Sequence, residues 1–390
     1  MGKRCKLNTE GHGLNGYWPC LALLLLVVSC GGRTPPAADP PPTAVSPSPT
    51  AESRTPTPDS PPPTTESLPP TADSPPPTAD SPPPTPDSPP PTALTTPTVD
   101  PAIGLPCAAT PPVKPDYAAY SLSAAPWPTP DPAAAPPPLA LIDPLPGSER
   151  NEGYPYGSDG SGRYLLHNGL DMADEAGTAA VAPFAGEVIL ARDDLDEHFG
   201  WRCDWYGQLV VIRAEQLHDG QPVYALFGHV ADVAVSEGQH VAAGQPVARQ
   251  GTAGAAVVPH VHLEVRVGAN AFGATRNPVL WLAPPEGQGV IAGRLVDPEG
   301  RAWQGVTVTL IDPSGAPPYR TTWTYLDDPD HSIRPDPALG ENFVFGPVAA
   351  GTYEVYTQVQ GVEHRQPVEV VAGTLSTIEI ITEPYQTSTP

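Results

Sequence analysis

Short strand-like runs of apolar residues, in part alternating with polar residues, recur throughout the C-terminal two-thirds of the chain. In the first part of this region the strand-like runs cover residues 186–191, 208–213, 222–229, 240–249 and 260–267. Gly and Pro turns separate these runs, and no amphipathic helical pattern lies between them. Alternation with a period of two is typical of half-buried strands. We therefore predict an all-β barrel or sandwich for residues 139–283.

A second β-rich region begins at a polar Pro/Gly step near residues 284–287. Its alternating runs cover residues 289–297, 306–312, 321–326, 342–345, 352–359, 367–371 and 377–381. Short strands at this spacing over about a hundred residues are typical of an Ig-like β-sandwich. We predict this sandwich over residues 284–384, with residues 385–390 as a tail.

The N-terminal third lacks this alternation and contains most of the 59 prolines of the 390-residue chain. A seven-residue Pro/Thr/Ser/Asp repeat starts at Thr57, Thr64, Thr71, Thr78 and Thr85. Proline occupies the positions that a coiled coil would need for apolar side chains, so polyproline II is favoured, with a rise of about 3.1 Å per residue. About seventy such residues would reach on the order of 200 Å. We predict a disordered linker over residues 30–138 that separates the β-rich regions from an anchor.

The first 29 residues have the pattern of an export signal. Lys3, Arg4 and Lys6 precede an apolar run over residues 21–28, and Cys30 follows. The run is shorter than the roughly 20 residues that a membrane-spanning helix needs. The pattern resembles a bacterial lipobox, which implies cleavage before Cys30 and lipidation of its sulfur. An ordinary secretory signal is the alternative. Both place the mature protein outside the cytoplasm, anchored to the envelope membrane through Cys30 or secreted.

Charge and cysteine content limit the partners and the covalent structure. The formal net charge of −24 argues against nucleic acid as a partner, because nucleic acid binding needs a basic surface. Cys5 and Cys20 lie in the signal segment and Cys30 would carry lipid, so Cys107 and Cys203 remain. Two thiols in an exported protein indicate a disulfide, which would tie the end of the linker to a loop of the first β region. Two free thiols are the alternative.

Two short phrases carry candidate chemistry: His167-Asn-Gly-Leu-Asp171 and His260-Val-His262. In an extended strand, residues two or four apart point to the same face. We therefore expect His167 and Asp171 to share one strand face and His260 and His262 another. Imidazoles and a carboxylate that converge on an open position are typical ligands of a catalytic zinc ion.

Residues 139–282 resemble the LytM/lysostaphin-type zinc metallopeptidases. The resemblance rests on an ordered series of segments: 154–158, 167–171, 182–188, 206–212, 227–230 and 259–265. An isolated HxH is common, but this order is specific. The resemblance implies the β-rich fold called the duplicated hybrid motif. It also implies one zinc ion per domain, bound by His167, Asp171 and His262.

The same resemblance assigns proton transfer to His229 and His260. One would take the proton from water, and the other, protonated, would stabilise the oxyanion and supply the leaving amine. We favour His260 as the base because it shares a strand face with His262. No HExxH helix is present, so a glutamate base of the thermolysin type is not expected. Glu264 lies on the same strand face and is interpreted either as a partner of the zinc ligands or as a solvated or ion-paired side chain.

Three further expectations concern residues outside these phrases. The acidic segment 193–197 lacks the ligand spacing of a calcium loop and is expected to be solvated. Trp201, Trp205 and Tyr206 are expected either at the substrate cleft or in the core. The region after residue 284 resembles Cna-B or carboxypeptidase-regulatory-like domains and is expected to bind cell wall or protein.

The function indicated by the sequence is that of an exported zinc metalloendopeptidase acting on peptide bonds of peptidoglycan stems or cross-bridges. A non-catalytic module of the same fold, which binds cell wall or activates amidases, is the alternative. A structural adhesin that displays its sandwich on a stalk is a third hypothesis, but it gives the histidines no role.

Overall fold

The computed structural model describes residues 105–386, except 109, 111, 313, 315–318 and 329–331. The predicted signal segment, Cys30 and the repeats lie outside the described residues. The prediction of an all-β fold is confirmed. Within the described part, the only helices are two short 3₁₀ turns, η1 (Phe272–Ala274) and η2 (Pro278–Leu280). No helix in this part is long and apolar enough to cross a membrane.

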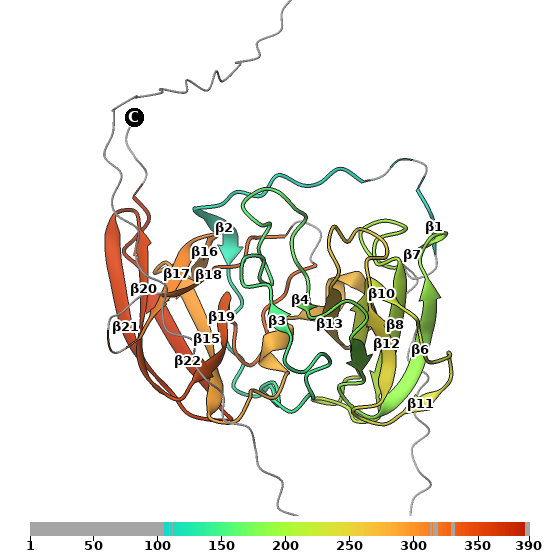
Figure 1. The fold of residues 1–390 in the computed structure, drawn as a ribbon. Coiled ribbons are helices and arrows are strands. Elements are labelled where there is room, and N and C mark those ends of the chain that lie inside the picture. Colours follow the sequence, from blue (N-terminus) through green and yellow to red (C-terminus); the bar gives the residue numbers. More distant parts are fainter. Residues whose placement is uncertain are drawn as a thin grey trace, which may run out of the picture. The chain divides into compact units, whose positions relative to one another are not determined.

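The first region is built on one long antiparallel sheet with the strand order β11-β6-β8-β9-β13-β4-β3 (Figure 1). Its strands are β3 (Glu149–Arg150), β4 (Leu170–Ala173), β6 (Gly186–Asp193), β8 (Gln208–Ala214), β9 (Val223–Gly228), β11 (His240–Val241) and β13 (Val261–Val267), and β14 (Thr275–Arg276) also pairs with β13. A smaller sheet has the order β10-β12-β5 and contains β5 (Ala179–Val181), β10 (Val230–Ala231) and β12 (Pro246–Gln250).

Four predicted runs of this region match single strands, and the fifth does not. The run at residues 240–249 is divided into β11 and β12, which belong to different sheets. The break falls at Gly244, whose φ of +79° forms the intervening turn. The sheets enclose a core that includes Val210, Phe227 and Leu263, each without exposed surface.

The second region contains two packed sheets. One has the order β19-β15-β16-β2, with β22 parallel to β15, and the other has the order β18-β17-β20-β21. Their strands are β2 (Ser121–Pro126), β15 (Gln288–Val296), β16 (Arg301–Gln304), β17 (Thr307–Ile311), β18 (Arg320–Trp323), β19 (Phe343–Ala349), β20 (Gly351–Val359), β21 (Val362–Val370) and β22 (Leu375–Ile381). Leu295, Phe343 and Val355 belong to the core between them. We call this region the C-terminal sandwich.

The disordered linker predicted for residues 30–138 is wrong for its last part. β2 pairs with β16 as the edge strand of a sandwich sheet, and β1 (Leu105–Pro106) pairs with β7 (Glu197–His198). Trp127 follows β2, is buried, and donates its indole N–H to the Glu341 carbonyl oxygen at 3.2 Å. An edge strand tolerates proline because its outer N–H groups need no partner. The high proline content therefore obscured this strand in the sequence.

The predicted boundary at residues 283–284 does not separate two independent cores. Val290 and Ala292 of β15 belong to the hydrophobic core of the first region. A further core cluster joins Tyr156 and Leu166 of the first region to Tyr325 of the second. Both regions belong to one compact unit of the chain.

Candidate metal centre

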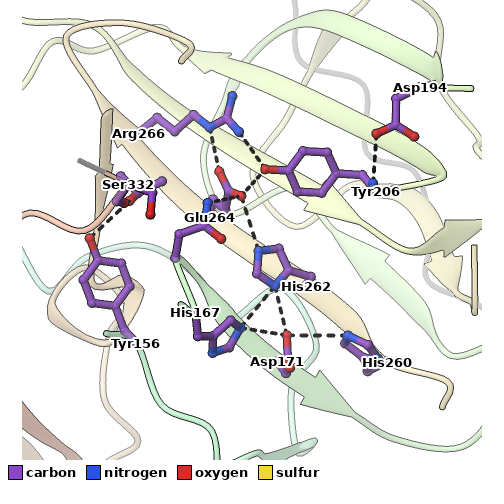
Figure 2. Close-up of polar contacts among 12 residues, drawn as sticks. Tyr156, His167, Asp171, Asp194, Tyr206, His260, His262, Glu264, Arg266 and Ser332 are labelled. Carbon is purple, nitrogen blue, oxygen red and sulfur yellow. Dashed lines mark hydrogen bonds and ion pairs between the residues drawn. The ribbon is translucent and has the colours of Figure 1, made fainter. Parts of the chain in front are cut away.

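Three predicted ligands meet at the junction of β4 and β13. Asp171 of β4 lies directly opposite His262 of β13 in the strand register, and Asp171 Oδ1 is 2.9 Å from His262 Nδ1. His167 Nε2 lies 3.1 Å from the same carboxylate oxygen and 3.2 Å from His262 Nδ1 (Figure 2). One donor atom from each residue falls within 4.8 Å of the others. Two nitrogens and an oxygen so placed could hold a metal ion.

His167 does not reach this point by sharing a strand face with Asp171. It lies in the segment before β4, and Gly169 bends the chain between the two residues. A Cβ at Gly169 would lie 2.6 Å from the His262 ring and 2.5 Å from the Leu263 carbonyl oxygen. Only glycine permits this close approach. The HxxxD spacing is therefore satisfied by a turn into the strand.

The orientation of the His167 ring is fixed from behind. Its Nδ1 lies 2.6 Å from the Tyr154 carbonyl oxygen, which can only accept a hydrogen bond. Nδ1 therefore carries the hydrogen, and the lone pair of Nε2 faces Asp171 and His262. The Tyr154 ring stacks on the imidazole, with centroids 4.2 Å apart and an interplanar angle of 7°. The family resemblance includes Tyr154 in segment 154–158, but the sequence gives no sign that its carbonyl and ring hold the His167 imidazole.

His262 is oriented by Glu264. His262 Nε2 donates to Glu264 Oε1 at 3.3 Å, which leaves Nδ1 to face Asp171. Glu264 has no exposed surface and also accepts hydrogen bonds from Asn168 Nδ2, Arg266 Nε and the Tyr206 hydroxyl. Figure 2 shows Glu264 on one side of His262 and Asp171 with His167 on the other. Glu264 is thus a buried partner of the candidate ligand His262 and is ion-paired with Arg266, so the ion-paired interpretation is confirmed and the solvated one is wrong.

Neighbouring opposite charges stabilise the ionised forms of Glu264, His262 and Asp171. Burial favours the neutral acid, but Arg266 and the hydrogen bond from His262 lower the pKa of Glu264 to about 2. Burial disfavours imidazolium, yet hydrogen bonds and charge from Asp171 and Glu264 raise the pKa of His262 to about 9. Burial also acts against ionised Asp171, but His167 and His262 hold its pKa well below the ordinary range. The three candidate ligands, His167, Asp171 and His262, therefore form a site that attracts positive charge. A metal cation bound there could replace the proton that His262 holds.

His229 and His260 lie beside these three candidate ligands. His229 Nδ1 donates to the Ala253 carbonyl at 2.9 Å, and His260 Nδ1 donates to the Val258 carbonyl at 2.8 Å. Nε2 of each is therefore the nitrogen left for a reacting group, and that of His260 is 3.5 Å from Asp171 Oδ1. The two rings lie 4.8 Å apart. Burial, followed by the neighbouring His262 and His260, lowers the pKa of His229 to about 3.

All five histidine and aspartate side chains line one open cleft of about 720 Å³. Its lining includes Trp205 and the segment 255–258, in which Val257 and Val258 are 79% and 59% exposed. Glu149, Glu152 and Tyr154 also line the cleft. The cleft therefore offers both apolar and polar surface to a bound chain.

Residues near the acidic segment differ from expectation. Asp194 is fully buried and accepts hydrogen bonds from the backbone N–H groups of Trp205, Tyr206 and Gly207, so the solvated interpretation is wrong for it. Trp205 lines the cleft, whereas Tyr206 lies in the core with its hydroxyl on Glu264. Asn168, Tyr206 and Arg266 were not recognised as supports of the site, because only the fold brings them to Glu264.

Cys107 and Cys203 form a disulfide, with Cα atoms 5.7 Å apart. Cys203 lies in the segment between β7 and β8, two residues before the cleft residue Trp205. The bond joins the segment after β1 to a loop beside the cleft.

Residues 165–274 match the model of Peptidase family M23, and this segment is a domain of that family. An uncharacterized metalloprotease of Haemophilus influenzae is 26% identical over 130 residues, which cover 33% of this chain and 24% of the relative. A lipoprotein NlpD/LppB homolog of Pseudomonas aeruginosa is 31% identical over 111 residues, which cover 28% of this chain and 31% of the relative. The chain thus spans 24% and 31% of the length of these two curated relatives.

Solved structures are also similar to parts of the chain. The catalytic domain of the antimicrobial peptidase lysostaphin from Staphylococcus simulans has a TM-score of 0.28 and 23% identity, and the match covers 34% of this chain and 91% of that one. A putative peptidase M23 from Pseudomonas aeruginosa has a TM-score of 0.26 and 30% identity, and the match covers 35% of this chain and 49% of that one.

Proposed function

We propose that this protein is an exported zinc metalloendopeptidase that hydrolyses peptide bonds in the stem peptides or cross-bridges of peptidoglycan. The observation that carries the proposal is the convergence of His167, Asp171 and His262 in an open cleft, with His229 and His260 beside them. Membership of residues 165–274 in a peptidase family supports the reaction class. The export signal and the Pro-rich linker support a substrate outside the cytoplasm.

One zinc ion would be held by Nε2 of His167, Oδ1 of Asp171 and Nδ1 of His262. The donor set fits, because three protein ligands with an open side are typical of catalytic zinc sites, and the second nitrogen of each imidazole already has a partner. A zinc ion bound there would supply a Lewis acid that makes water more acidic and polarises a carbonyl group.

His260 is the proposed base. Its Nε2 faces Asp171, whose carboxylate stabilises the imidazolium formed when the ring takes a proton. The same nitrogen can then give the proton to the leaving amine. Burial, followed by the neighbouring His262 and His260, lowers the pKa of His229 to about 3 and outweighs the attraction of Asp171, so this ring is neutral. His229 is therefore not protonated before substrate binds. We assign the neutral His229 ring to hydrogen bonding with the reacting groups.

The cleft walls would hold the peptide across the site. Trp205, Val257 and Val258 offer apolar surface, and backbone and carboxylate groups among the lining residues 149–154 offer hydrogen-bond acceptors. Packing against the apolar surface would also exclude water from the reacting bond. Such positioning raises the rate because the bond and the proton-transfer groups start in a reactive arrangement.

The remaining parts give the enzyme its place in the envelope. We assign residues 1–29 to a signal peptide, Cys30 to a lipid anchor, and the Pro-rich segment to a tether. Residues 139–283 form the peptidase domain in this proposal, and residues 284–384 form a sandwich whose outer surface binds cell wall or protein. A non-catalytic module of the same fold is the alternative, but a module without catalysis has no need for both His229 and His260 beside a complete ligand set.

A digest of purified cell walls tests the proposal. Mature protein is incubated with peptidoglycan in the presence of zinc, with a chelator, and with zinc restored, and muropeptides are identified by mass spectrometry. We expect new amino termini in the zinc-containing samples and none with the chelator or with His262→Ala. Unchanged muropeptides with wild-type protein that contains zinc would contradict the proposed substrate and favour the non-catalytic alternative.

A further inference from the structure

The metal ligand His167 is supported by a loop outside any sheet. We call residues 154–158 the support loop. Gly157 donates its backbone N–H to the His167 carbonyl at 2.8 Å, and His167 donates its own N–H to the Ser158 carbonyl at 2.9 Å. The imidazole Nδ1 donates to the Tyr154 carbonyl at 2.6 Å. The backbone and the ring of His167 therefore both take their orientation from the support loop.

The C-terminal sandwich holds this loop in place. Leu326 donates its N–H to the Gly157 carbonyl at 2.9 Å. The Tyr325 ring packs edge-on against the Tyr156 ring, with centroids 5.2 Å apart. Tyr156 and Tyr325 are almost completely buried, at 3% and 1% exposure. The loop thus lies against residues that follow β18, far away in the sequence.

Hydrogen bonds from the Tyr156 hydroxyl extend this contact. The hydroxyl accepts the Arg334 N–H at 3.1 Å and shares a hydrogen bond with Thr275 Oγ1 at 3.1 Å. Thr275 in turn donates to the Ser332 carbonyl, and Figure 2 shows Ser332 close to the Tyr156 hydroxyl. Both polar neighbours of the hydroxyl therefore lead to residues 332–334 of the sandwich.

The contact between the support loop and the C-terminal sandwich requires glycine at position 157. Its φ is +80°, and a Cβ there would lie 2.5 Å from Cδ1 of the Tyr325 ring and 2.9 Å from its Cβ. The second atom is close to the backbone, so the ring cannot simply rotate away. Any side chain at this position would separate the support loop from the sandwich.

We infer that the C-terminal sandwich is an integral part of the metal site, with Tyr156, Gly157 and Tyr325 as positioning residues that act through His167. Misplacement of the support loop removes the acceptor behind the imidazole and weakens metal binding, although none of these residues touches the ligand atoms. The inference rests on the proposed metal site and is independent of the proposed substrate.

Zinc affinity of the full mature chain, measured by competition with a chromophoric chelator, tests this inference. The test variant is Gly157→Ala and its matched control is Gly162→Ala. Gly162 has nearly the same φ, +82°, and a Cβ there would have nothing within 4 Å. Both variants carry the same backbone strain, but only Gly157→Ala pushes on Tyr325. We expect zinc affinity to fall about 10-fold or more in Gly157→Ala and less than about twofold in Gly162→Ala.

A second pair of variants applies if Gly157→Ala does not fold. Tyr156→Phe removes only the hydroxyl that contacts Thr275 and Arg334, and Tyr353→Phe removes an exposed hydroxyl that donates to Ala349 elsewhere in the sandwich. We expect weaker zinc binding in Tyr156→Phe and wild-type affinity in Tyr353→Phe. Wild-type zinc affinity in a folded Gly157→Ala or in Tyr156→Phe would overturn the inference. Failure of the wild-type chain to bind zinc would instead overturn the proposed function.

Discussion

Nε2 of His262 lies 3.3 Å from Oε1 of Glu264, a carboxylate with no exposed surface. This contact fixes which imidazole nitrogen carries the hydrogen and turns the other nitrogen towards Asp171. Glu264 also accepts from Asn168 and Arg266, so it cannot move without leaving their donors unpaired. The candidate ligand His262 is thus oriented by a buried ion pair on the side of its ring that faces away from Asp171.

Glu264→Gln should weaken zinc binding by about 10- to 100-fold, the usual effect of removing a hydrogen-bonded carboxylate behind a histidine ligand. Glutamine keeps the size of the side chain but loses the charge that makes His262 more basic. Affinity is measured by chelator competition. The control is Glu354→Gln, which breaks an exposed ion pair with Arg365. Equal affinities in the two variants would exclude this role for Glu264.

His260→Ala should separate metal binding from hydrolysis. If His260 transfers a proton and is not a ligand, kcat/KM falls about 10²- to 10⁴-fold while zinc affinity stays near wild type. Hydrolysis of cell-wall peptides and zinc content are measured on the same preparations. His240→Ala, which removes a largely exposed ring, is the control. Loss of zinc in His260→Ala would mean that His260 is a ligand.

The Cys107–Cys203 disulfide should stabilise the fold by about 4 to 5 kcal/mol. It joins residues 96 positions apart, and such a crosslink reduces the conformational freedom of the unfolded chain. Urea unfolding with and without reductant measures the effect. In the Cys107→Ser/Cys203→Ser double variant, reductant should change nothing. Identical unfolding of the wild-type chain under both conditions would contradict the prediction.

Glu341 should make stability depend on pH. Burial, followed by the nearby Asp336, raises the pKa of Glu341 from 4.5 to about 8. Between these values the folded chain keeps a proton that the unfolded chain releases. The stability contributed by Glu341 is therefore fully present below about pH 4.5 and falls as pH rises to about 8, by at most about 1.4 kcal/mol per pH unit. Burial also raises the pKa of Asp336, which adds to the same trend, while Arg276 opposes it.

Glu341→Gln checks the sign of this effect. The amide stays neutral, and its oxygen can still accept the Asp336 N–H that Glu341 accepts at 2.9 Å. We expect the variant to gain stability relative to wild type at pH 8 and to gain little at pH 5, in urea unfolding at both values. The exposed Glu369→Gln variant is the control. A gain that is equal at both pH values would point to a packing effect unrelated to ionisation.

Local pattern in the sequence was sufficient for several features. Strand β6 shows buried residues at alternating positions, as expected for a strand that faces a core on one side. Strands β8, β9 and β13 are buried on both faces and were found as short runs rich in apolar residues between turns. The two histidine phrases indicated the ligand chemistry, because imidazole nitrogens and a carboxylate oxygen are common zinc ligands. The opposition of Asp171 and His262 in neighbouring strands followed from neither phrase, because strand register depends on the whole sheet.

Contacts between distant segments were decided by the tertiary structure alone. The predicted linker gave no sign that residues 121–126 would complete a sandwich sheet, since an edge strand gains its stability from its partner. Nor did any local pattern link Tyr325 to Gly157, which meet where the second β region packs against the first. Glu264 and Tyr206 likewise become neighbours only when β13 and the segment before β8 join the same sheet. The sequence by itself determined which groups could bind a metal and move protons. The register within the first sheet and the packing of the second β region against the support loop decided how His262 and His167 are oriented.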